Sequence, residues 1–180
     1  GVRRDISDDA AKWILDTIKT VEKETLQLKS TILDDATVKL RTVGKGILTK
    51  EKAYELGAAG PTLRASGVAQ DMRQTGYAAY SDLDFAPVVE TDGDCYARTV
   101  VRFKETLQAI DLIRQCFSKI PQGELSVKPK GLPSGEVVAR VEQPRGEVLY
   151  YLRGSGKKFL ERVRIRTPTF ANIPPLLEIG

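Results

Sequence analysis

Apolar side chains recur at helical spacing in two long stretches of the chain. The stripe of the first stretch consists of Ile14, Ile18, Val21, Thr25, Leu28 and Ile32. The second stretch runs from Asp92 to about Ser118, and one face carries Val100, Phe103, Leu107, Ile110, Ile113 and Phe117. Residues three and four apart share one side of an α-helix, so both stretches predict long amphipathic helices. The first stripe fits the seam of a helical bundle or a face covered by a partner subunit.

Capping and stop signals place the ends of these helices. Ser7 precedes two carboxylates, which is typical of a helix start, and Asp92 or Asp94 caps the second long helix. Thr49–Gly57 reads as a short capped helix that glycine ends, and Gly60-Pro61 starts another. Val38–Ile47 is short and β-branched with two glycines, and residues 75–91 are expected to form an ordered loop.

The last third of the chain has the alternation and turn residues of a sheet. Residues 119–135 are rich in proline and glycine and predict a loop. Three strands are expected at 136–142, 147–153 and 158–166, with turns at Pro144-Arg145-Gly146 and Gly154-Ser155-Gly156. Helices followed by an antiparallel meander indicate the α+β class, with a helical part over 1–135 and the meander over 136–180.

Composition excludes several kinds of chemistry. The 180 residues include 28 basic and 24 acidic side chains, two cysteines and no histidine. Ser-His-Asp and Cys-His catalysis are therefore excluded, and Cys95 and Cys116 lie too far apart on one helix to pair. An ordinary zinc, copper or haem site cannot be built from these side chains, so we expect no cofactor in this chain alone. The small charge excess, +4, is interleaved along the chain, which disfavours nucleic acid as a partner.

Two motifs near the end of the chain are candidates for a binding site. In Glu142-Gln-Pro-Arg-Gly-Glu147 the proline and glycine set a tight bend that projects Arg145. In Thr167-Pro168-Thr169 a hydroxyl follows the proline that stops the last strand. A guanidinium and a hydroxyl suit a small anionic or strongly polar ligand, although a surface hairpin with an incidental arginine fits the same spacing.

Six ordered blocks that cover essentially the whole chain resemble one known family. The blocks are Gly60-Pro-x-Leu-Arg-x-Ser-Gly-Val68, Asp71-x-Arg73, Gly93-Asp-Cys-Tyr-x-Arg98, Ile113-Arg-Gln-Cys116, Glu142-x-Pro-Arg-Gly146 and Arg166-x-Pro-x-Phe-Ala-Asn172, with Gly1–Ile6 preceding them. They resemble the large subunit of membrane-bound, energy-converting nickel–iron hydrogenases and the homologous quinone-site subunit of respiratory complex I. The sequence of residues 158–174 resembles the Ech-type and carbon-monoxide-induced hydrogenases more than it resembles the complex I subunit.

The resemblance implies roles for individual residues. Arg145 matches the arginine that hangs over the bimetallic centre, where it stabilises developing charge or acts as a base. Its high pKa favours the electrostatic role. Pro168 and Thr169 match the position that contacts an iron-bound cyanide. The groups Arg64/Asp71/Arg73 and Asp94/Arg98 are expected to form structural salt bridges or to support a proton path, and for the first group a buried network and a simple Asp–Arg pair remain open.

The family's nickel ligands, two Cys-x-x-Cys pairs, have no counterpart in this sequence. We therefore expect the central segment of a longer subunit, inactive when isolated, whose parent holds the nickel–iron centre. The resemblance implies an iron–sulfur electron-transfer subunit and membrane subunits as partners, on the cytoplasmic face of a membrane. An isolated segment would expose apolar surface and is therefore expected to self-associate. The alternatives are the quinone-reducing branch and a non-catalytic scaffold against an iron–sulfur subunit.

Overall fold

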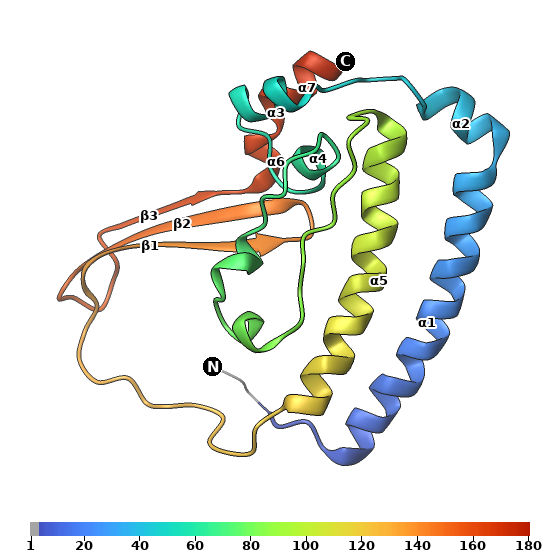
Figure 1. Ribbon diagram of the computed structural model, residues 1–180. Helices are drawn as coiled ribbons and strands as arrows, with labels where there is room; N and C mark the ends of the chain where they lie inside the picture. Colours follow the sequence, from blue (N-terminus) through green and yellow to red (C-terminus); the bar gives the residue numbers. More distant parts are fainter. Residues whose placement is uncertain (1–3) are drawn as a thin grey trace.

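The computed structural model describes residues 4–180 and has the α+β architecture that the sequence predicts (Figure 1). In chain order its elements are α1 (Asp8–Asp34), α2 (Ala36–Thr42), α3 (Lys50–Glu55), α4 (Pro61–Arg64), the 3₁₀ turns η1 (Met72–Thr75) and η2 (Tyr80–Asp82), α5 (Cys95–Lys119), β1 (Ser134–Gln143), β2 (Gly146–Ser155), β3 (Arg162–Arg166), α6 (Pro168–Ala171) and α7 (Ile173–Ile179). Gly1 to Arg3 of the first sequence block lie outside the described residues. Among residues 4–180, no helix combines the length and hydrophobicity needed to cross a bilayer.

The two long helices, α1 and α5, lie side by side, and both begin where the sequence places them (Figure 1). The Ser7 hydroxyl accepts a hydrogen bond from the amide of Ala10 at 3.3 Å, which caps α1. Asp94 rather than Asp92 caps α5, because its Oδ1 accepts from the amide of Ala97 at 2.7 Å. These bonds satisfy amides that have no partner in the first turn of a helix.

Only part of the predicted stripe on α1 is covered by α5. Ile18 is buried, whereas Val21 and Leu28 stay 41% and 55% exposed. An ion pair between Glu22 and Arg114 also joins the two helices, with Arg114 Nη1 donating to Glu22 Oε1 at 3.0 Å. A single neighbouring helix covers a narrower arc than a bundle would, so the remaining apolar side chains face outward.

The β-branched stretch that starts at Val38 is helical as far as Thr42. Its helix, α2, begins because the Asp35 carboxylate accepts a hydrogen bond from the amide of Val38 at 2.8 Å. Gly44 and Gly46 then reverse the chain with positive φ angles of 65° and 58°. A cap and a glycine stop therefore outweigh the weak β preference of the side chains in between.

The predicted meander is confirmed as an antiparallel sheet in the order β1-β2-β3. Its turns differ from the prediction, since Gly154 and Ser155 are still paired within β2, opposite Gly135 and Ser134. The third strand starts at Arg162 instead of residue 158. Small residues add two pairs to the ladder because no side chain interferes with Pro133, against which Gly154 packs.

The prediction that residues 136–180 form only a meander is wrong at its end. After β3 the chain turns into two short helices, α6 and α7, and each begins with proline in its first turn. A proline cannot extend the strand ladder, but its fixed φ suits the start of a helix. Figure 1 shows α6 and α7 beside α3 and α4, where the sheet meets the helical part.

Candidate functional site

The bend between β1 and β2 is built by backbone packing against the start of α4. Gln143 pairs with Gly146, so Pro144 and Arg145 form a two-residue turn. A Cβ on Gly60 would collide with the carbonyl oxygen of Arg145 and would lie 2.6 Å from the amide nitrogen of Gly146. Both glycines also have positive φ angles, 65° and 123°. Both positions therefore need glycine, because of the positive φ angle and because a side chain would collide. Their close contact fixes the position of the Arg145 backbone.

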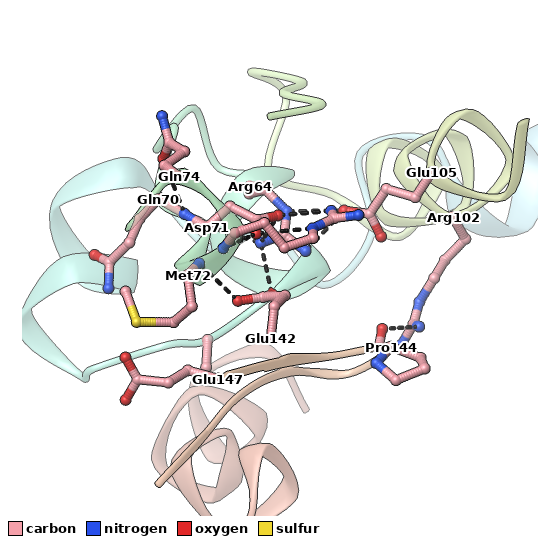
Figure 2. A network of polar contacts seen from close by, with 12 residues as sticks. Arg64, Gln70, Asp71, Met72, Gln74, Arg102, Glu105, Glu142, Pro144 and Glu147 are labelled. Atoms are coloured by element: carbon pink, nitrogen blue, oxygen red, sulfur yellow. Dashed lines mark hydrogen bonds and ion pairs between the residues drawn. The ribbon is translucent and has the colours of Figure 1, made fainter. Parts of the chain in front are cut away.

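An arginine from α5 holds the same bend. The guanidinium of Arg102 donates a hydrogen bond to the carbonyl oxygen of Pro144 at 2.7 Å (Figure 2). The bond spans 42 positions of the sequence and attaches the turn to α5. Arg102 was missed by the sequence analysis, because nothing in its local pattern distinguishes it from other exposed helical arginines.

Arg145 and Thr169 line one cavity of about 230 Å³ beside this bend. Its other lining residues are Thr62, Arg102, Asn172, Ile173, Leu176 and Ile179. The structure thus places Arg145 and Thr169, both exposed, along one cavity that also has Arg102 and an apolar wall from α7. Pro168 does not line this cavity; it is buried as the first residue of α6 and sets the start of the turn that carries Thr169.

Asn172 fixes the cavity wall to the loop before α4. Its Oδ1 accepts from the amide of Ala59 at 2.8 Å, and its Nδ2 donates to the carbonyl of Ala59 at 3.1 Å. This pair of bonds closes a gap of 113 positions in the sequence. The asparagine belongs to a block that the sequence analysis singled out, but only the fold reveals its partner.

Arg64 lies at the centre of a buried ion-pair network, and its residue is only 1% exposed (Figure 2). It contacts Asp71 at 3.0 Å, Glu105 at 2.8 Å and Glu142 at 2.9 Å. Asp71 is also held by Arg73, which donates from Nε at 2.9 Å and from Nη2 at 2.7 Å, and it caps η1. Both possibilities left open by the sequence are therefore present: the Asp–Arg pair fixes a turn, and Arg64 extends it into a network that joins α4, η1, α5 and β1.

Asp94 and Arg98 do not pair with each other within residues 4–180, so this part of the salt-bridge expectation is wrong. Asp94 Oδ2 accepts from the amide of Gly44 at 2.7 Å, in addition to capping α5. Arg98 donates to the carbonyls of Gly93 at 2.8 Å and Gly46 at 2.7 Å. Both side chains bind backbone groups of the adjoining loops, which otherwise would remain unsatisfied.

Glu105 is a partly buried member of the network around Arg64. Burial raises the pKa of its carboxyl above the ordinary value of 4.5, while the charge and hydrogen bonds of Arg64 act in the opposite direction. The shift is upward, so desolvation outweighs the ion pair. Glu105 is therefore easier to protonate than an exposed glutamate.

The described residues offer no ligand set for a transition metal. No three histidine, cysteine, aspartate or glutamate side chains of residues 4–180 come together as a metal site. Cys95 begins α5 and Cys116 lies near its other end, as predicted. The cavity beside Arg145 can thus supply charge and hydrogen bonds to a polar group, but a nickel ion would need ligands from other residues.

Comparisons with known proteins extend the match over nearly the whole chain. The family described as respiratory-chain NADH dehydrogenase, 49 Kd subunit, matches residues 1–132 and 125–179. Similar proteins include a component of the F(420)H(2) dehydrogenase of Methanosarcina mazei, 37% identical over 98% of this chain and 51% of that protein. The carbon monoxide-induced hydrogenase of Rhodospirillum rubrum is 38% identical over 96% of this chain and 48% of that protein. The alpha component of the membrane-bound hydrogenase of Pyrococcus furiosus is 36% identical over 96% of this chain and 45% of that protein.

The chain spans about half the length of these curated relatives. Their names are those of redox enzymes, and both branches suggested by the sequence blocks are represented: hydrogenases among the relatives, and NADH dehydrogenase in the family description. The family resemblance drawn from the six blocks is confirmed. On the extent of these matches, this chain belongs to the family of the 49 kDa subunit of the respiratory-chain NADH dehydrogenase.

Proposed function

We propose that this chain is the central part of the catalytic subunit of a membrane-associated nickel–iron hydrogenase, which interconverts dihydrogen with protons and electrons. The observation that carries the proposal is the cavity that Arg145 and Thr169 share, at the two motifs with hydrogenase counterparts. The similarity to carbon monoxide-induced and membrane-bound hydrogenases supports this branch.

In this role the chain's residues would surround the metal centre without ligating it. The nickel–iron centre would supply the redox chemistry, held by cysteines outside the described residues. Arg145 would stabilise negative charge through a preorganised cation, and the Thr169 hydroxyl would donate a hydrogen bond to a bound anionic group. Arg102 and Asn172 would keep these two side chains in place, since each fixes one wall of the cavity.

The test is Arg145→Lys in the full-length parent enzyme. We expect hydrogen turnover to fall by on the order of 10² or more while nickel content is unchanged, because lysine keeps the charge but loses the planar fork. Arg153→Lys is the matched control, since Arg153 lies exposed on the same sheet and pairs only with Glu136 and Glu161 within the described chain. Wild-type turnover in the Arg145 variant would refute the role.

A second candidate, quinone reduction, is favoured by the apolar wall of the same cavity. Ile173, Leu176 and Ile179 line this cavity together with Arg102 and Arg145. An apolar slot with polar groups at one side suits a quinone head group. Quinone binding by the parent protein, together with the absence of nickel from the purified complex, would decide for this branch.

The proposal extends to partners and place. We infer an iron–sulfur subunit that carries electrons and membrane subunits that anchor the complex on the cytoplasmic face. Co-purification of the tagged parent subunit with an iron–sulfur protein from membranes tests this assignment. Recovery of the parent subunit alone, without iron or membrane proteins, would count against it.

A further inference from the structure

The buried network around Arg64 contains one more carboxylate than arginines. Arg64 and Arg73 contribute two positive charges, and Asp71, Glu105 and Glu142 contribute three negative charges when ionised. With every group ionised the network therefore carries a net charge of −1. An unbalanced charge is costly away from water, and buried carboxyls commonly avoid that cost by binding a proton.

Hydrogen bonds distinguish the three carboxylates. Both oxygens of Asp71 accept from Arg73, and Glu142 accepts from Arg64 at Oε1 and from the amide of Met72 at Oε2, 3.0 Å away. Glu105 receives Arg64 Nε and Nη2 on the same oxygen, Oε1. No group within residues 4–180 donates to Oε2 of Glu105. This is the one carboxylate oxygen of the network, as far as the structure describes it, that can take a proton without losing a hydrogen bond.

A cavity of about 370 Å³ lies next to this carboxyl. The charged and titratable groups that face it come from every surrounding element: Arg64 from α4, Arg73 from η1, Tyr80 from η2, Arg102 from α5 and Glu142 from β1. The side chain of Glu105 remains 13% exposed and lines this cavity, so its carboxyl group is not sealed from water. Within the described chain, no ion pair joins Arg102 to Glu105.

We propose that this network binds one exchangeable proton, on Oε2 of Glu105, and exchanges it with solvent through the 370 Å³ cavity. Proton uptake converts the carboxylate to a carboxylic acid, with hydronium leaving as water, and changes the net charge of the network from −1 to zero. The hydrogen bond from Arg64 Nε to Oε1 and the close contact of Nη2 with the same oxygen stay in place. The upward pKa shift caused by burial agrees with this assignment.

Arg102 connects the proton site at Glu105 to the bend that carries Arg145. Arg102 lies one turn before Glu105 on α5, lines the same cavity and also lines the cavity of Arg145 and Thr169. Its guanidinium binds Pro144, so a change of charge at Glu105 alters the field at the residue that holds the bend. This consequence applies whichever redox reaction the parent performs, because it depends only on the charges of this chain.

The experiment is a ¹³C NMR titration of the aspartate and glutamate carboxyl carbons in the full 180-residue chain. Glu105 should titrate with a midpoint above pH 4.5, and this signal should be missing in Glu105→Gln, whose amide mimics the protonated acid. Glu22→Gln is the matched control, because Glu22 also pairs with an arginine but has a lowered pKa through its hydrogen bond from Arg114. The Glu22→Gln control should leave the titration midpoint of Glu105 unchanged.

Two results would overturn the proposal. One is a midpoint for Glu105 at or below pH 4.5, and the other is a high midpoint that belongs to Asp71 or Glu142 and persists in Glu105→Gln. Side-chain to backbone correlations assign Glu105 in the wild-type chain, so the measurement does not depend on the folding of the variant. Because the groups are coupled, the observed midpoint describes the network, and the site of the chemical-shift change identifies the proton's position.

Discussion

Replacing Arg64 with methionine should destabilise the chain far more than removing any exposed arginine. Methionine has similar bulk but neither charge nor donors, so the network loses one arginine and its net charge changes from −1 to −2. Arg64 contacts three carboxylates and also donates to the carbonyl of Gln70 at 3.0 Å. All these bonds disappear together, and their separate values cannot be added.

The contacts that remain limit the expected loss of folding free energy in Arg64→Met. Asp71 keeps both bonds from Arg73, and Glu105 can recover water through its cavity. Within the described chain, Glu142 is left with the amide of Met72 as its one remaining donor on the carboxylate. The loss is therefore close to that of one buried ion pair broken on one side, about 3–5 kcal/mol. For a chain of this length that corresponds to a fall in melting temperature of roughly 6–20 °C.

Urea denaturation followed by circular dichroism measures this loss, with Arg114→Met as the control. Arg114 pairs with Glu22 at the surface, where both side chains are about one-third exposed, so we expect a loss several times smaller than in Arg64→Met. The loss in Arg64→Met should also shrink as pH falls, because protonation of the carboxylates removes the uncompensated charge. Equal losses in the two variants, or a loss that does not depend on pH, would refute the reasoning.

Three further predictions rest on particular contacts. Gly60→Ala should reduce the free energy of unfolding by about 2–4 kcal/mol, because alanine there has a positive φ and collides with the bend. Gly57 has the same φ but open space, so Gly57→Ala should cost about 1 kcal/mol. Equal losses by thermal denaturation would contradict this reasoning. The pKa of Glu22 is lowered by Arg114, so its ion pair should stabilise the fold above pH 4.5 and lose that effect as pH falls, and the difference in stability between wild type and Glu22→Gln should vanish in acid. Cys116, which is exposed, should react with a thiol reagent faster than the half-buried Cys95, whose sulfur accepts from Arg98 at 3.2 Å; equal rates by mass spectrometry would be inconsistent with the fold.

The sequence alone predicted the elements whose boundaries depend on a few neighbouring residues. The caps at Ser7 and Asp94 and the glycine- and proline-rich loop after α5 set the boundaries of the two long helices. The meander followed from alternation and turn residues. The same local signals were insufficient at the C-terminus, where the prolines of α6 and α7 end a strand and begin a helix within a few positions.

The candidate site divides in the same way. Arg145, Thr169 and the Arg64–Asp71–Arg73 group could be named from short motifs, because turn chemistry and clustered charges act over a few residues. Arg102 and Glu105 stood in no motif, and Glu142 and Asn172 stood in quoted blocks without any sign of what they contact. The partners of all four lie 41 to 113 positions away. Those pairings depend on α4 packing against the bend between β1 and β2, an approach that the bare backbones of Gly60 and Gly146 permit. Periodicity and capping are properties of adjacent residues, but the meeting of distant charges, and the desolvation that gives them their effect, arises when the elements pack.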